Sequence, residues 1–178
     1  KQPRPQGNRL AILTNAGGPA VLAADALVES GGVLSDLSKS TMDALNAFLP
    51  PAWSHSNPVD VLGDASAERY ARALKMVEAD PATDGLMVLL TPQSMTNATA
   101  TAEAIVEAAK GMKKPVLASW MGAGSVEEGR KILIKAGIPV FAHPDTASSI
   151  FTLMWRHADN LRALYETPDL SAGSEEGV

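Results

Sequence analysis

The stretch RLAILTNAGGPAVLAADALVES, residues 9–30, indicates the fold most directly. Its first six residues, Arg9–Thr14, form an apolar run typical of a buried strand, and the alanine-rich segment Pro19–Ser30 is typical of a helix. Gly17 and Gly18 separate the two, and Pro19 fits the first turn of a helix, where its missing N–H costs no hydrogen bond. We therefore expect a strand–turn–helix unit whose turn is built mainly from backbone.

The same alternation continues along the chain. Continuous apolar runs such as Leu86–Leu90 are typical of central parallel strands, and capping-box spacing at Ser40–Asp43 and Ser125–Glu128 predicts two helix starts. Strands are predicted at Val33–Leu34, Leu86–Leu90, Pro115–Trp120 and Ile138–Phe141, and helices at about 40–49, 66–79, 125–135 and 144–165. A further helix is predicted to carry Ile105, Val106 and Ala109. This order predicts an α/β fold, a three-layer, doubly wound parallel sheet covered on both faces.

Composition narrows the class of protein. The chain has 178 residues, of which 46% are hydrophobic and 20% charged, as expected for one globular domain. A net charge of −5 without a basic cluster argues against nucleic acid as a partner, and no apolar run approaches the ~20 residues that cross a membrane. Cysteine is absent, which excludes disulfides and thiol chemistry in these residues and fits a cytoplasmic location.

Both ends of the chain have the composition of linkers. Residues 1–8 contain two prolines and a glycine without periodicity, and residues 171–178 are small, polar and acidic. We therefore expect a linker over 1–8, one domain over 9–168 and a second linker over 169–178. A domain framed in this way is typical of a piece of a longer protein.

Ligands of open parallel sheets bind beyond the carboxyl ends of the strands. Four predicted loops lie there: Asn15–Pro19, the long segment 50–66, Thr91–Asn97 and Met121–Ser125. The first, with Asn15, Ala16, Gly17 and Gly18, precedes a helix whose terminal N–H groups suit a phosphate or carboxylate. An ordinary strand-to-helix turn explains the same residues.

Two further loops carry candidate binding residues, each with a structural alternative. Asn57 and Asp60 lie in a long segment without predicted structure, and such segments are often functional, yet Asp60 or Asp64 is also placed to cap the next helix. Residues 91–97 offer hydroxyls and amides for a phosphate, whereas Ser94 or Thr96 alternatively serves as a helix cap.

Catalytic side chains are not evident. His55 lies near Asn57, His143 precedes a predicted helix and His157 lies within it. The spacing of histidines and carboxylates matches no metal set or nucleophile elbow. We therefore predict neither a catalytic residue nor a metal site in this chain, and we assign no role to His55.

Four segments together resemble one family: TNAGGP (14–19), NPVDVLGDA (57–65), LTPQ (90–93) and PVLASWMG (115–122). They are similar to the second flavodoxin-like CoA-ligase domain of the NDP-forming acyl-CoA synthetases, the ADP-forming acetate–CoA ligases. That domain is related to the C-terminal domain of the succinyl-CoA synthetase β subunit. The resemblance runs from about Asn8 to Pro168 and implies a flavodoxin-like fold.

The resemblance also implies a reaction, acyl-CoA + ADP + phosphate ⇌ acid + CoA + ATP, through an acyl phosphate and a phosphohistidine. CoA, ATP or ADP, and Mg²⁺ would bind the parent protein, and none is expected to bind this chain tightly. The family's phosphoryl-binding helix end matches the loop with Thr91, Pro92, Gln93 and Ser94, extending to Thr96. Two sets of residues would line the same cleft: Asn15, Ala16, Gly17 and Gly18, and Asn57 and Asp60.

In the family, the phosphohistidine lies in a segment of the preceding domain that this chain lacks. The family's CoA-binding and ATP-grasp domains are also absent from these residues. These domains are the expected partners, together with acyl-CoA or acyl phosphate and, in some arrangements, a second copy. The chain alone is expected to be inactive. Two alternatives stay open: a regulatory domain of a protein-lysine acetyltransferase, and a flavodoxin-like receiver or flavin protein, although the acidic cluster and lysine of a receiver are missing.

Overall fold

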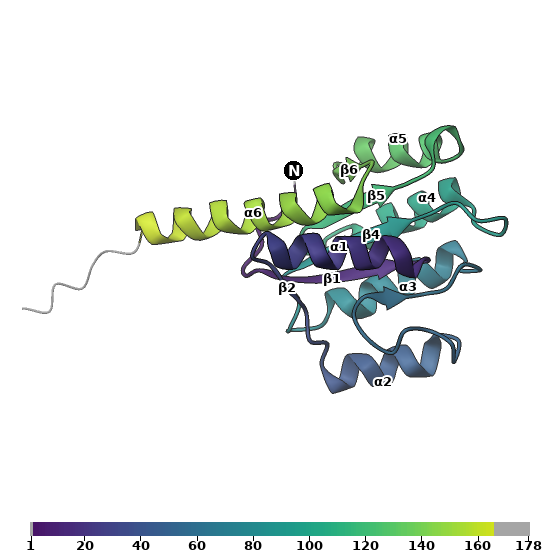
Figure 1. Ribbon diagram of the computed structural model, residues 1–178, viewed down its shortest axis with the longest axis horizontal. Helices are drawn as coiled ribbons and strands as arrows, with labels where there is room; N and C mark the ends of the chain where they lie inside the picture. Colours follow the sequence, from purple (N-terminus) through teal and green to yellow (C-terminus); the bar gives the residue numbers. More distant parts are fainter. Residues whose placement is uncertain (1, 166–178) are drawn as a thin grey trace, which may run out of the picture.

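The computed structural model describes residues 2–165, which form one parallel sheet of six strands between two layers of helices (Figure 1). The strands are β1 (Arg9–Thr14), β2 (Val33–Leu34), β3 (Val59–Asp60), β4 (Gly85–Leu90), β5 (Val116–Trp120) and β6 (Val140–Phe141). The helices are α1 (Gly17–Glu29), α2 (Lys39–Phe48), α3 (Ala67–Glu78), α4 (Ala98–Ala109), α5 (Glu127–Lys135) and α6 (Pro144–Tyr165). The predicted three-layer α/β fold is confirmed.

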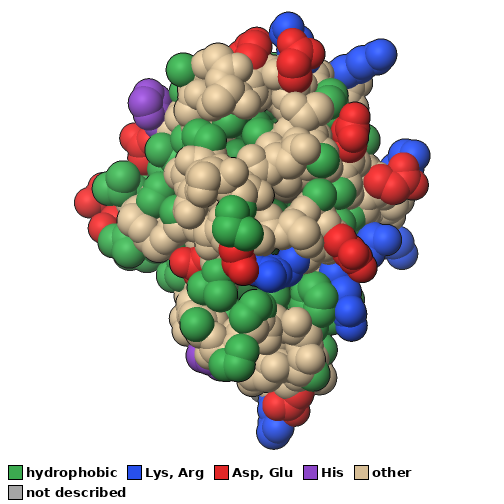
Figure 2. Space-filling view, turned by 90° about the vertical axis from the view of Figure 1, so that its right-hand side faces the viewer, with side chains coloured by type: hydrophobic (Ala, Val, Ile, Leu, Met, Phe, Trp, Pro, Cys, Tyr) green, Lys and Arg blue, Asp and Glu red, His purple; other side chains and the backbone are tan. Residues whose placement is uncertain are grey.

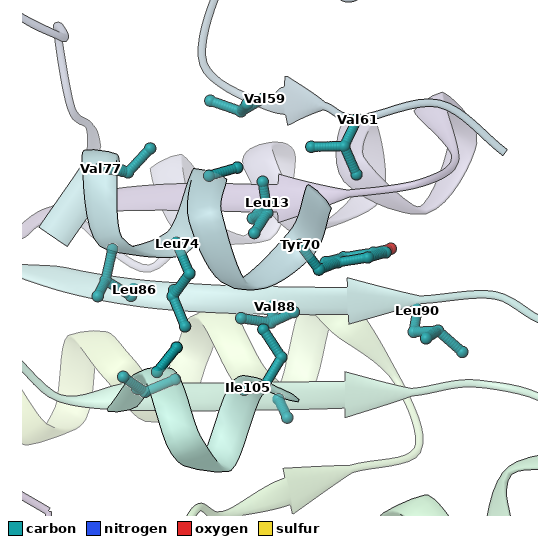
Figure 3. Packing of buried hydrophobic residues seen from close by; sticks show 14 of the residues in the cluster. Leu13, Val59, Val61, Tyr70, Leu74, Val77, Leu86, Val88, Leu90 and Ile105 are labelled. Carbon is teal, nitrogen blue, oxygen red and sulfur yellow. The ribbon is translucent and has the colours of Figure 1, made fainter. Parts of the chain in front are cut away.

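Side chains alternate across the strands and so build two cores. One core lies between the sheet and the pair α1 and α6, and contains Leu10, Ile12 and Phe151. The other lies under α3 and its neighbours, where Figure 3 shows Leu13 and Val88 of the sheet facing Leu74 and Ile105 of the helices. Because every strand residue of β4 is buried, this strand carries side chains into both cores.

The strand order β2-β1-β4-β5-β6 places β1 near one edge of the sheet. At this edge the expectation of a structureless loop over 50–66 is wrong in one respect. Residues 59 and 60 form β3, which pairs in parallel with the carboxyl end of β1, Leu13 to Val59 and Thr14 to Asp60. β2 pairs only with Arg9 and Leu10 at the other end of β1. Two short strands therefore share one edge of β1.

The predicted helices are present, but the N-terminal caps of four of them differ from the sequence-based expectation. Ser38 caps α2, Ser66 caps α3 and Asn97 caps α4, each by accepting a backbone N–H. Thus the caps are not Ser40, Asp60, Asp64, Ser94 or Thr96. Ser125 lies in a short 3-10 turn over residues 123–126, and α5 has no side-chain cap. For α2 the reason is tertiary, because Asp80 from a distant loop holds Ser38 in place.

The amino-terminal residues lie against the sheet at the amino ends of β5 and β6. The Gln2 side chain accepts the N–H of Val116 at 2.8 Å and donates to the carbonyl of Gly137 at 2.9 Å. The expected linker over 169–178 lies outside the described residues, and the domain boundaries stay predictions. Among residues 2–165, no helix combines the length and apolarity needed to cross a membrane.

Candidate functional site at the carboxyl edge of the sheet

The strands β1, β3, β4 and β5 end at the same side of the molecule, on the right of Figure 1, and Figure 2 views this side directly. The predicted loops therefore come together here. Charged side chains of both signs lie around the rim of this face, and its upper middle is largely uncharged (Figure 2).

Asn15 joins the loops that follow β1 and β4. Its side chain is 2% exposed, and its Oδ1 accepts both the N–H of Thr91 at 3.0 Å and the Thr91 hydroxyl at 3.1 Å. Its Nδ2 donates to the Thr91 carbonyl at 2.8 Å. A buried amide needs such partners for all its polar atoms. Asn15 therefore holds the two strand ends together, and its side-chain polar atoms bond within the domain.

The Thr91–Asn97 loop is largely exposed at this edge. Pro92, Gln93, Ser94 and Met95 are exposed, and the Met95 side chain is 72% accessible. Two of the backbone amides expected to contact phosphate already donate hydrogen bonds within the domain. The N–H of Thr91 donates to Asn15 Oδ1, and the N–H of Thr96 donates to the carbonyl of Gln93 at 2.9 Å. The accessible part of this loop is therefore centred on Ser94.

Gln93 and Gly63 bring the loops after β3 and β4 into contact. Gln93 Nε2 donates to the carbonyl of Asn15 at 3.1 Å, while its side-chain amide lies directly on Gly63. A Cβ on Gly63 would meet Gln93 Oε1 at 2.1 Å, so a larger residue at 63 would displace the Gln93 side chain. Likewise, Gly122 of the loop after β5 lies against Pro92, with φ of 129°, a conformation that favours glycine.

Asn57 lies beside β1 and away from the exposed loops. Its Oδ1 accepts the N–H of Ile12 at 2.9 Å, and its Nδ2 donates to the carbonyls of Leu10 and Ser35, both at 3.0 Å. All its side-chain polar atoms are thus bonded to backbone. The structure therefore gives Asn57 a supporting position rather than a lining one.

Asp60 ends β3 beside the first turn of α1. Its Oδ1 accepts the N–H of Leu62 at 2.9 Å, and its Oδ2 lies 3.9 Å from the position that a Cβ on Gly17 would occupy. Gly17 and Gly18 are exposed, and Ala16 provides no side-chain cap. A carboxylate, not a cation, is thus the charged group beside this helix end.

Tyr70 is a buried residue of this region that the sequence analysis did not single out. Its hydroxyl donates to the carbonyl of Leu89 at 2.9 Å, just below the strand ends. Burial, and secondly the negative charge of Asp60, raise the pKa of the Tyr70 phenol well above its ordinary value. The phenol therefore stays neutral. Tyr70 lies on the apolar face of α3, as a core residue does. The sequence pattern therefore gave no indication that it lies near the candidate site.

Positive side chains are scarce at this edge. Residues 15–18, 61–66, 91–97 and 121–125 contain no lysine, arginine or histidine. Arg69 reaches the edge, but its guanidinium donates to Asp64 Oδ1 at 2.6 Å, and this hydrogen bond lowers the pKa of the Asp64 carboxyl. Within residues 2–165 there is also no cluster of three metal-ligating side chains. Only backbone N–H groups and neutral side chains are therefore available to an anion here.

His55 lies outside this face, against α2. Its Nδ1 is 2.8 Å from Asn46 Oδ1 and its Nε2 is 2.9 Å from the carbonyl of Pro51. Both ring nitrogens therefore have partners within the domain. His143 precedes α6, and His157 lies on its exposed side, as expected.

The chain is similar to known proteins over most of its length. Residues 10–162 fit the model of the family described as Ligase-CoA domain. The chain belongs to this family. Three relatives help to place this Ligase-CoA domain. The ADP-forming acetate–CoA ligase II subunit alpha of Pyrococcus furiosus is 40% identical over 158 residues, which are 86% of this chain and 35% of the relative.

The ADP-forming 4-hydroxybutyrate–CoA ligase of Nitrosopumilus maritimus is 34% identical, over 89% of this chain and 23% of the relative. Among solved structures, the dinucleotide-forming acetyl-coenzyme A synthetase 1 of Ca. Korarchaeum cryptofilum, in complex with phosphate and ADP, has a TM-score of 0.84 and 31% identity. That match covers 92% of this chain and 36% of the other. The Ligase-CoA domain thus spans about a third or less of the length of these relatives.

Proposed function

We propose that this chain is the second flavodoxin-like domain of an ADP-forming acyl-CoA synthetase. The parent protein would interconvert acyl-CoA, ADP and phosphate with acid, CoA and ATP, through an acyl phosphate and a phosphohistidine. The family membership and the ligase names of the relatives support this proposal. They favour it over a regulatory domain of a lysine acetyltransferase. A cytoplasmic location stays a prediction.

The role proposed for the domain is to hold the phosphoryl group at the loop before α4. The observation that carries it is a difference between helix ends. The first turns of α3, α5 and α6 contain acidic residues, whereas those of α1, α2 and α4 do not. Asp80 bonds to the cap of α2 and Asp60 lies beside α1, while α4 is capped only by the neutral Asn97.

An uncompensated helix N-terminus favours an anion, through both its dipole and its N–H groups. The exposed residues Gln93, Ser94 and Met95 lie in the loop that leads into that end of α4. Of the residues named from the resemblance, Thr91 and Pro92 would then shape this loop, while Gln93 and Ser94 would lie nearest to the phosphoryl group. Asn15 would hold the loop from below, and Ala16, Gly17 and Gly18 would line the same cleft.

The remaining parts of the reaction would come from the rest of the parent protein. Because the loops carry no cation, the positive charge needed beside a phosphoryl group would be supplied by Mg²⁺ or by another domain. CoA, the adenine nucleotide and the phosphorylated histidine are likewise assigned to the CoA-binding, histidine-bearing and ATP-grasp domains. The 178-residue chain alone is then expected to show no ligase turnover.

The test uses the parent protein, with phosphorylation of its histidine followed by rapid quench. Ser94→Asp adds a negative charge at the α4 end and should slow phosphorylation at least about tenfold, as expected for like charges separated by a few ångströms. Ser40→Asp, at an exposed serine in the first turn of α2, is the matched control and should have no effect. Equal rates for both variants and the wild type would disprove the assignment.

A further inference from the structure

Asp60 presents a carboxylate where an anion-binding role would require a positive or neutral environment. Its Oδ2 lies 3.9 Å from the Cβ position of Gly17, the first residue of α1. The family resemblance implies that Asp60 lines the cleft of the phosphoryl group. A fixed negative charge in this position must influence which of the neighbouring helix ends accepts a phosphate.

The position of this carboxylate is set by the sheet. Asp60 pairs with Thr14 in the β1–β3 ladder, and its own N–H donates to Ser54 Oγ at 2.9 Å. Its Oδ1 accepts the N–H of Leu62, which leaves Oδ2 directed toward α1. The hydrogen bond to Oδ1 holds this carboxylate beside the first turn of α1.

At a second helix a carboxylate from a distant loop bonds directly to the cap, whereas Asp60 lies beside α1 without such a bond in the part of the chain that the structure describes. The first turn of α2 also lacks acidic residues, and Asp80 Oδ2 accepts from the N–H of Ser38 at 2.8 Å and from its hydroxyl at 2.9 Å. Burial raises the pKa of Asp80, but hydrogen bonds from Thr41, Ala82 and Ser38 outweigh it and lower the pKa overall. Asp80 is thus a carboxylate from a distant loop that compensates a helix N-terminus.

We propose that Asp60 is a specificity-determining residue, which compensates the positive end of α1 and excludes the phosphoryl group from it. This inference rests on the proposed function, because it assumes that a phosphoryl group reaches this edge of the sheet. Like charges repel strongly at such short distances, and the dipole of α1 is already balanced by the carboxylate. Of the N-termini of α1 and α4, only that of α4 then accepts the anion.

The test titrates inorganic phosphate into the 178-residue chain at low ionic strength and follows backbone amides by NMR. In the wild type, amides of residues 93–99 should shift, and those of Gly17 and Gly18 should not. Asp60→Asn should add saturable shifts at Gly17 and Gly18, with an affinity at that end at least about tenfold higher, since a like charge has been removed. Asp64→Asn, in the same loop, is the matched control and should leave the pattern of the wild type.

The outcomes separate the two proposals. Saturable shifts at Gly17 and Gly18 in the wild type would overturn the role of Asp60, and so would their absence in Asp60→Asn. Shifts that appear only at Gly17 and Gly18, and only in the variant, would support Asp60 while removing support for the α4 cradle. If Asp60→Asn does not fold, Asp60→Ser retains an acceptor for the N–H of Leu62 without the charge, and the same criteria apply to it.

Discussion

The Oδ1 atom of Asn57 accepts the backbone N–H of Ile12 at 2.9 Å, and so completes the edge of β1. β2 pairs with the first two residues of β1 and β3 with the last two, which leaves a gap between them. A buried strand N–H without a partner is costly. The Asn57 side chain fills this gap in the manner of a third short strand.

Replacing Asn57 with alanine should lower the free energy of unfolding by about 1–3 kcal/mol, because the N–H of Ile12 would lose its partner in the sheet. Urea unfolding followed by circular dichroism measures this. Ser56→Ala, one residue earlier and exposed, is the control and should change stability by less than about 0.5 kcal/mol. Similar losses for the two variants would contradict the role given to Asn57.

Asn15→Ala should loosen the loop before α4 as well as the fold. The variant removes the partners of the N–H and hydroxyl of Thr91, so we expect a loss of about 1–3 kcal/mol. Hydrogen exchange of the Thr91 amide should accelerate more than that of Leu86, at the other end of β4. Uniform acceleration along the strand would instead indicate only global destabilisation.

Gly63→Ala should be destabilising through a single neighbour, Gln93. The new Cβ would overlap the Gln93 amide, which must then leave its bond to the carbonyl of Asn15. We expect a loss of about 0.5–1.5 kcal/mol, the net contribution of one hydrogen bond. In a chain that already carries Gln93→Ala, Gly63→Ala should cost little more, and a double-mutant cycle gives the coupling. Additive effects would show that the strain lies elsewhere.

Stability should fall in acid partly through the Asp84 carboxylate, at the opposite end of the sheet. Burial raises its pKa, but hydrogen bonds and charge from Arg9 outweigh this, so the pKa lies below its ordinary value. A lowered pKa means that the native state binds the proton less well than the unfolded chain does. The stabilisation is therefore present above about pH 4 and lost as the pH falls through the lower, native-state value.

Asp84→Asn should therefore cost about 1.5–3 kcal/mol at neutral pH, the range for hydrogen bonds to charged groups. Its unfolding free energy should also fall less between pH 7 and pH 3 than that of the wild type, as measured by urea titration at each pH. Asp43→Asn, which removes an exposed pair with Lys39, should change neither value appreciably. An unchanged pH dependence in Asp84→Asn would contradict this explanation.

Much of the fold could be predicted from local sequence patterns. The apolar runs at Arg9–Thr14 and Leu86–Leu90 and the intervening helix periodicities identify strands and helices because each pattern is contained in one element. The two-residue strand β3 was missed, since Val59 and Asp60 carry no such pattern. The helix caps were misplaced for a related reason: Ser38 and Ser40 offer the same hydroxyl, and a contact with Asp80 decides between them.

By itself, the sequence determined the alternating order of elements and the family to which the loop motifs point. Only the tertiary structure decided what the polar residues of those motifs contact. Asn57 bonds to β1 across 45 positions and Asn15 bonds to Thr91 across 76, so neither partner is visible in a local pattern. The sign of the charge beside each helix end, with Asp60 at α1 and neutral Asn97 at α4, likewise depends on which strands pair, because pairing sets which side chains share the edge of the sheet.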